Sequence, residues 1–246
     1  MKNIKIILEY DGTGFSGWQF QPNQRTLQGE FEAAVRKISG EDLRVTASGR
    51  TDAGVHALGQ AVNFKTGSDM DAAAWQGALN HFLPAEMRAL EAAEVPEDFN
   101  ARYCAKGKQY GYIVLNRRIP SPLKRNYSWH VPMPLDMEAM KEGAGHLLGE
   151  HDFTSFRAVN SDGINPVRTL RTLEILPDGN RIFFSLEANG FLRHMVRTVV
   201  GTLVEVGKGR FRPEDVRDML QARDRSKAGP TAPGQGLYLV SVRYET

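Results

Sequence analysis

The sequence contains a single cysteine, Cys104, among 246 residues. One thiol cannot form a disulfide within its own chain, which is typical of proteins from a reducing compartment. No apolar run approaches the roughly 20 residues that a membrane-spanning helix needs, and the first residues lack the apolar stretch of a secretory signal. These absences lead us to expect a cytoplasmic protein that does not enter a membrane.

Patterns that bind metals or nucleotides are also missing. The six histidines form no His-Glu-x-x-His pattern and no pairing with cysteine, so the sequence predicts no metal site. Residues 12–17 match G-x-G-x-x-G after a strand pattern, but no helical spacing opens there, which excludes a dinucleotide site. Cys104 has no recognisable base partner and is expected in the core. We therefore expect no metal and no organic cofactor.

The charge is nearly balanced, because 31 basic residues stand against 29 acidic ones and give a net charge of +2. The contents of 41% hydrophobic and 24% charged residues are typical of globular proteins. Basic residues gather locally at Lys106, Lys108, Arg117, Arg118, Lys124, Arg125, Arg193, Arg197, Lys208, Arg210 and Arg212. Such clusters are usually solvated faces, although they also suit nucleic acid.

The first half reads as strand, helix, strand, strand, helix, strand. Alternating apolar residues predict strands at 3–10, 43–47, 60–64 and 87–95. Apolar residues at helical spacing predict a helix between Thr26 as its N-cap and Gly40 as its stop. A second helix, capped by Ser68 or Asp69, is expected to carry Trp75, Leu79 and Phe82.

The second half repeats that order. Strands are expected at residues 109–115, 170–176, 181–188 and 237–244, with helices at 136–148 and from Phe191 to Gly207 and a short one that begins near Pro213. We therefore predict an α+β fold of two tandem ferredoxin-like (split β-α-β) units with antiparallel sheets meeting at a central cleft. The expected domains are residues 1–105 and 106–246.

The segment of residues 48–57, Ser-Gly-Arg-Thr-Asp-Ala-Gly-Val-His-Ala, is the most informative one. It follows a strand, holds two glycines that allow close approach of the backbone, and places Asp52 near Arg50. By composition alone, an aspartate in a glycine-containing loop is most often a turn former that bonds its own backbone.

Together with further blocks, this segment resembles the tRNA pseudouridine synthase A family over nearly the whole chain. The blocks are residues 10–21, 48–57, 99–102, 108–112, 149–153, 190–197 and 228–237. Three positions, Lys108, Thr198 and Gly234, depart from the residues that are frequent in that family.

The resemblance implies an isomerase that converts uridine to pseudouridine at positions 38, 39 and 40 in the anticodon stem-loop of tRNA, works as a homodimer and needs no cofactor. Asp52 would be the catalytic carboxylate. Arg50 and Arg197 would hold it ionised and orient it, and Tyr110 would stack on the flipped base.

Two other classes of protein stay open. A non-catalytic RNA-binding module fits the ferredoxin-like pattern and the basic clusters, but it gives no reason for Asp52 beside Arg50. A glycoside hydrolase usually needs a second carboxylate at working distance. Asp11, Glu150 and Asp152 lie in the resembling blocks, but the resemblance assigns none of them that role.

Overall fold

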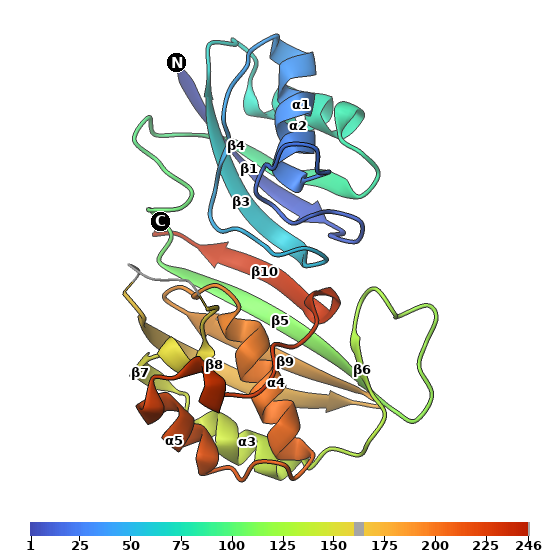
Figure 1. Cartoon of the computed structure of the whole chain (residues 1–246). Helices are drawn as coiled ribbons and strands as arrows, with labels where there is room; N and C mark the ends of the chain where they lie inside the picture. The colour runs from blue at the N-terminus through green and yellow to red at the C-terminus, as the bar shows by residue number, and fades with distance from the viewer. Residues whose placement is uncertain (160–164, 246) are drawn as a thin grey trace. The chain divides into compact units, whose positions relative to one another are not determined.

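The chain has a mixed α+β fold, which a computed structural model describes over residues 1–159 and 165–245 (Figure 1). It divides into two compact units. The first unit consists of Met1–Lys106 with Tyr238–Thr246, and the second unit consists of Gly107–Leu237. The division after Lys106 lies one residue from the boundary expected from the sequence. The last segment, which the sequence placed with the second half, groups instead with the first unit.

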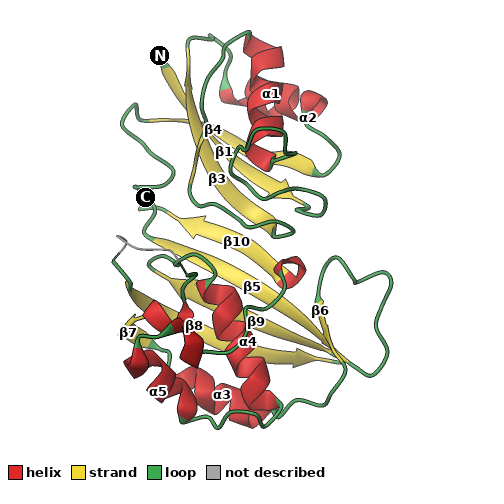
Figure 2. Ribbon diagram, viewed as in Figure 1, coloured by secondary structure: helices red, strands yellow, loops and turns green. Residues whose placement is uncertain are grey.

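The first unit is built on an antiparallel sheet. The strand order is β4-β1-β3-β2, and β10 also pairs with β3, in parallel, at His56 and Ala57. Both helices cover one face of this sheet (Figure 2). The antiparallel order of β1 to β4 is that of one split strand-helix-strand unit. The elements are β1 (Lys2–Tyr10), α1 (Leu27–Ser39), β2 (Thr46–Ala47), β3 (His56–Thr66), α2 (Ala72–Phe82), β4 (Met87–Val95) and β10 (Leu237–Arg243).

The predicted signals account for β1 and α1. Alternate residues of β1 face the core, and Ile4, Ile6 and Leu8 are fully buried. Helix α1 begins after Thr26, whose hydroxyl accepts a hydrogen bond from the Gly29 amide, and it ends at Gly40 with φ 72°. The predicted caps of this helix are thus confirmed.

Helix α2 and strand β2 differ from the predictions. The helix is capped by Asp71 rather than by Ser68 or Asp69, because the Asp71 carboxylate accepts the Ala74 amide. Trp75 is fully buried as predicted, whereas Phe82 at the last turn is 41% exposed. The strand expected at residues 43–47 is reduced to its last two residues.

The second unit also has helices packed on one face of a sheet (Figure 2). Its strand order is β5-β9-β8-β7, all antiparallel, with β6 added in parallel to β5. The elements are β5 (Gly107–Asn116), β6 (Trp129–Val131), α3 (Met137–Gly145), β7 (Gly149–Asp152), β8 (Val167–Asp178), β9 (Arg181–Ala188), α4 (Met195–Gly207) and α5 (Asp215–Ala222), with short 3-10 turns at Thr154–Phe156, Arg225–Lys227 and Gly234–Gly236.

The sequence predicted β9 with its observed bounds but missed β6 and β7, which are short and not clearly alternating. Helix α4 begins four residues later than the helical spacing suggested. His194 has a left-handed φ of 64°, so Phe191 lies in the loop before the helix. A second copy of the split unit stays a prediction. No helix in the described residues is both long and apolar enough to cross a membrane.

Candidate active site

Asp52 lies between β2 and β3, in a segment that we call the aspartate loop (residues 48–57) and whose last two residues begin β3. Its side chain is half-buried. The Asp52 carbonyl accepts a hydrogen bond from the Val55 amide at 3.2 Å, which closes a tight turn. Gly54, the third residue of this turn, has φ 73°, a conformation that glycine adopts without steric cost.

A second loop, the glycine loop (residues 11–18), packs directly against the aspartate loop. A Cβ atom at Gly12 would lie 2.0 Å from the Val55 carbonyl oxygen, and one at Gly17 would lie 2.8 Å from the Thr51 carbonyl oxygen. Only glycine permits two backbones to approach so closely. The glycine pattern that resembled a dinucleotide site therefore supports the aspartate loop.

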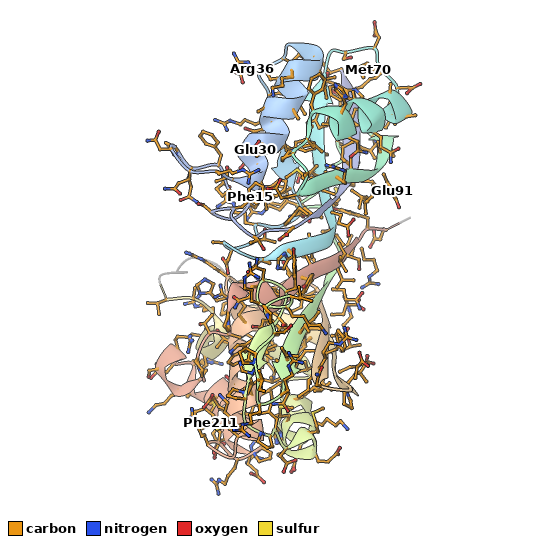
Figure 3. The ribbon with its side chains drawn as sticks, turned by 90° about the vertical axis from the view of Figure 1, so that its right-hand side faces the viewer. Phe15, Glu30, Arg36, Met70, Glu91 and Phe211 are labelled. Atoms are coloured by element: carbon orange, nitrogen blue, oxygen red, sulfur yellow. The ribbon has the colours of Figure 1, made fainter. Side chains whose placement is uncertain are left out.

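The glycine loop is fixed in turn to the start of α1. The Trp18 amide donates to the Thr51 carbonyl at 2.9 Å, and the Leu27 amide donates to the Gly17 carbonyl at 3.1 Å. Arg25 packs over the Phe15 ring at 4.3 Å and forms a salt bridge with Glu30 at 3.2 Å. Glu30 belongs to the first turn of this helix, and Phe15 lies near that end of the helix (Figure 3). Helix α1 thus holds the glycine loop, which in turn supports the aspartate loop.

Buried polar groups hold the first part of the aspartate loop. The Ser48 hydroxyl donates to the Gln60 side-chain oxygen at 2.5 Å, and the Gln60 amide donates to the Gly49 carbonyl at 2.8 Å. The hydroxyls of Tyr10 and Thr51 are 2.9 Å apart. Ser48 and Gln60 are fully buried, so their hydrogen bonds are costly to break.

Burial raises the pKa of Tyr10 well above its ordinary value, although hydrogen bonds to Thr51 and Gln60 offset part of this rise. The phenol therefore stays protonated throughout the physiological range and remains a hydrogen-bond donor. Its role beneath the aspartate loop is to hold Thr51, the residue that precedes Asp52.

His56 holds the far end of the aspartate loop. It is 2% exposed, and its Nδ1 atom accepts a hydrogen bond from the Gly12 amide at 3.1 Å. The Asp11 carboxylate oxygen lies 3.1 Å from the same nitrogen. The Tyr238 ring stacks on the imidazole with centroids 4.8 Å apart.

Arg50 was expected to orient Asp52. The structure places Arg50 at an exposed position, and among the described residues it forms no ion pair with Asp52 or with any other carboxylate.

Tyr110 belongs to the second unit and lies on β5. It is 8% exposed, and its ring packs edge-on against Phe191 with centroids 5.1 Å apart. Tyr112 on the same face is fully buried, and its hydroxyl donates to the Pro233 carbonyl at 2.8 Å. Burial raises the pKa of Tyr112, and the charge of Arg197 offsets part of this rise.

Arg197 lies in the first turn of α4, also in the second unit. Its Nε donates to the Ala232 carbonyl at 2.7 Å, and the Ala232 amide donates back to the Arg197 carbonyl at 3.0 Å. Gly201, one turn further along, allows the Pro230 carbonyl to touch the helix, since a Cβ there would lie 1.8 Å from that oxygen. The segment of residues 230–232 thereby holds the Arg197 side chain in place at its Nε atom.

The first unit brings Asp52 and Arg50 onto one loop, and the second unit carries Tyr110 and Arg197. Sequence reasoning missed the supporting residues Gly12, Gly17 and His56. The pattern of the glycine loop was visible in the sequence, but nothing in the order of residues indicated which backbone it would touch. Among the described residues, no group of three His, Cys, Asp or Glu side chains could hold a metal ion.

Comparisons with known proteins agree over the length of the chain. A family model described as tRNA pseudouridine synthase matches residues 6–104 and 144–245. The tRNA pseudouridine synthase A of Thermoanaerobacter sp. (strain X514) is 46% identical over 244 residues, which cover 99% of this chain and 100% of that protein. The proteins with the same name from Moorella thermoacetica and Halalkalibacterium halodurans are 48% and 50% identical, cover 99% and 96% of this chain, and are themselves covered over 100% and 90%.

Proposed function

This chain belongs to the tRNA pseudouridine synthase A family, and from that premise we propose how it carries out the reaction. The protein is a pseudouridine synthase, an isomerase that acts on tRNA. Its proposed targets are the uridines at positions 38, 39 and 40 of the anticodon stem-loop. The support for these positions is the resemblance of the aspartate loop and the other sequence blocks to the family.

Asp52 is the proposed catalytic residue. In the reaction the bond between C1′ and N1 breaks, the uracil rotates, and a bond forms between C1′ and C5, while C5 loses a proton and N1 gains one. A carboxylate can either attack C1′ or stabilise the positive charge that develops on the sugar, as carboxylates do in glycosidic cleavage. The observation that carries this proposal is that contacts on several sides fix the backbone around Asp52. The Gln60 side-chain amide binds the Gly49 carbonyl, the glycine loop packs against the aspartate loop, and His56 accepts the Gly12 amide.

Tyr110 is the proposed platform for the flipped base. Extruding a base costs on the order of a few kcal/mol, and stacking on an aromatic ring returns about 1–3 kcal/mol. The Phe191 ring holds the Tyr110 ring in place, which limits the side-chain entropy that stacking would cost. The Tyr110 hydroxyl would also help to remove the proton from C5.

Two arginines are proposed to act at the substrate site, one on the carboxylate and one on the RNA. Arg197, whose Nε is held by the Ala232 carbonyl, would supply a fixed positive charge that keeps the catalytic carboxylate ionised. Arg50, which is exposed, would bind RNA phosphate close to the target nucleotide.

The reaction is proposed to need no metal and no organic cofactor. It exchanges one carbon–nitrogen bond for one carbon–carbon bond within a single nucleotide. No electrons and no groups are transferred to a second molecule, so positioned side chains can supply the necessary chemistry. The proposed setting is the cytoplasm, in keeping with the single cysteine.

We propose further that the chain consists of two tandem ferredoxin-like units, each with an antiparallel sheet. The order of elements supports this repeat. In the first unit the elements run β1, α1, β2, β3, α2 and β4, and along the rest of the chain β5, α3, β8, β9, α4 and β10 follow in the same order.

The experiment that tests the function uses the purified protein alone with an unmodified tRNA transcript that carries uridine at positions 38, 39 and 40. Mapping should reveal pseudouridine at these positions, at an equal rate after desalting and treatment with a chelator. A transcript with cytidine at the three positions is the control and should stay unmodified. Modification only elsewhere in the tRNA would contradict the proposed targets, and a requirement for added metal would contradict the proposed mechanism.

A further inference from the structure

His56 is a buried imidazole at the end of the aspartate loop, and the mechanism above gives it no role. We propose that His56 is a positioning residue: through the hydrogen bond that its Nδ1 accepts from the Gly12 amide, it fixes the end of the aspartate loop and thereby the Asp52 carboxylate. The inference rests on the proposed catalytic role of Asp52. Because only 2% of His56 is exposed, it acts through the protein and not on RNA.

The path from His56 to Asp52 is short and consists of backbone contacts. Gly12 donates its amide to His56 at 3.1 Å, and its Cα faces the Val55 carbonyl so closely that a Cβ would lie 2.0 Å from that oxygen. The Val55 amide donates to the Asp52 carbonyl at 3.2 Å. A shift of Gly12 or His56 therefore displaces Val55 and opens the turn that carries the carboxylate.

The geometry also selects a proton arrangement on the imidazole. As the acceptor of the Gly12 amide, Nδ1 uses its lone pair, and an imidazole in this arrangement carries a proton on Nε2. The Asp11 oxygen near Nδ1 accepts the Thr13 amide at 2.9 Å. Moving a proton to Nδ1 would pair the ring with Asp11 but would deprive the Gly12 amide of its acceptor, which is costly in a buried site.

The imidazole has a second contact that suggests a purely structural alternative. The Tyr238 ring stacks on it with an interplanar angle of 28°, where β10 pairs with β3. If stacking were the whole role of His56, any flat ring would serve in its place. Substitutions at His56 can test the hydrogen-bond acceptor and the stacking ring separately.

His56→Asn keeps an acceptor oxygen at the place of Nδ1 and removes the ring, whereas His56→Phe keeps a ring and removes the acceptor. We expect kcat to fall by less than about fivefold in His56→Asn and by about a hundredfold in His56→Phe, the loss that a displacement of 1 Å can cause. KM for tRNA should change by less than about threefold in both, since His56 does not reach the RNA. His81→Asn, the same change at an exposed position of α2, is the matched control and should behave as the wild type.

Two further variants complete the test. His56→Gln moves the acceptor to the place of Nε2 and should resemble His56→Phe, which covers the case in which the Phe variant fails to fold. Asp11→Asn keeps an acceptor for Thr13 and removes the charge, and it should lower kcat by less than about threefold because the Gly12 hydrogen bond remains. Melting temperatures identify the folded variants.

The proposal is overturned if a folded His56→Phe protein turns over as fast as the wild type, because the acceptor would then have no part in holding the loop. It is also overturned if Asp11→Asn loses as much kcat as His56→Phe, because a charged pair would then hold the loop. Asp52→Asn is assayed in parallel. Retained turnover in that variant would refute the proposed catalytic role of Asp52, whatever the His56 variants do.

Discussion

Tyr110 and Tyr112 lie two residues apart on β5 and face the same side of the sheet, but their surroundings differ. Tyr112 is fully buried, and its hydroxyl is used by the Pro233 carbonyl. Tyr110 is 8% exposed, and its ring contacts Phe191. Because Tyr110 is the more exposed of the two, it is the one that we propose as the platform for the base.

Replacing Tyr110 by phenylalanine separates stacking from proton transfer. Tyr110→Phe keeps the ring and its contact with Phe191, so affinity for tRNA should stay within about twofold, while kcat should fall by about 10²–10⁴-fold because general acid–base assistance is lost. Tyr110→Leu should weaken both. Single-turnover rates and binding isotherms on the same preparations measure the two effects.

Tyr112→Phe is the matched control on the same strand. It removes the hydrogen bond to Pro233 and should lower the free energy of unfolding by about 1 kcal/mol with little change in turnover. Wild-type turnover in Tyr110→Phe would limit that residue to a stacking platform.

At the level of elements, the glycine loop is what connects helix α1 to the aspartate loop. The helix anchors this loop through the amides of Leu27 and Gln28, and the loop in turn supports Thr51 and Val55. These contacts join backbones, so the sequence determines them mainly by placing glycine where a side chain would not fit, at Gly12 and Gly17.

Gly12→Ala and Gly14→Ala test this arrangement. A Cβ at Gly12 would overlap the Val55 carbonyl, whereas a Cβ at Gly14 meets nothing within 4 Å. Gly12→Ala should therefore displace the aspartate loop, at a cost of about 1–3 kcal/mol in stability and at least about a tenfold loss of kcat. Gly14→Ala should cost only about 1–2 kcal/mol, because its φ of 79° is unfavourable for alanine, and should leave kcat unchanged.

Thermal melts and initial rates of pseudouridine formation distinguish these outcomes. If both variants lost stability and kept full turnover, the close packing of the two loops would have no part in holding Asp52.

The elements that could be predicted are those whose signals are local. Helix α1 has a capping residue, an apolar face and a glycine stop, and strand β9 has clear alternation and a turn before it. Strands β6 and β7 could not be predicted, because three or four residues are too few to show a period and their pairing depends on distant partners. The N-cap of α2 is Asp71 and not Ser68 or Asp69, because the segment offers several side-chain acceptors in a row and only that of Asp71 accepts the Ala74 amide.

On the scale of the whole molecule, recognising Asp52 depended on resemblance, because an aspartate in a loop is ordinarily a turn former. The sequence could not indicate that Gly12, Gly17 and His56 support its loop, since those contacts join positions as far as 44 residues apart. Arg50 was expected to act on Asp52 because the two lie close along the chain; its side chain is exposed, and its role stays a prediction.

The quaternary state is a further prediction at this scale. A subunit of 27.4 kDa offers limited surface for gripping a tRNA while one of its bases is flipped, so we expect a two-fold symmetric homodimer that shares the RNA. Sedimentation at the concentration of the assay should give about twice the mass of one subunit. A monomer with full activity at that concentration would exclude the dimer.

The central claim is that the carboxylate of Asp52 performs the chemistry, and Asp52→Asn tests it most directly. The change is nearly isosteric and leaves the turn with Val55 intact, so the melting temperature should stay close to that of the wild type. Binding of tRNA should survive or tighten, because a negative charge near phosphates is removed. Asp42→Asn, the same change at an exposed position, should have no effect.

Pseudouridine formation and tRNA affinity are measured on one preparation of each protein. We predict that turnover of Asp52→Asn falls by roughly a thousandfold or more, which corresponds to at least about 4 kcal/mol in the barrier, with affinity for tRNA retained. An Asp52→Asn protein that is folded, binds tRNA and forms pseudouridine at the wild-type rate would contradict the account, and Asp52 would then be an ordinary turn residue.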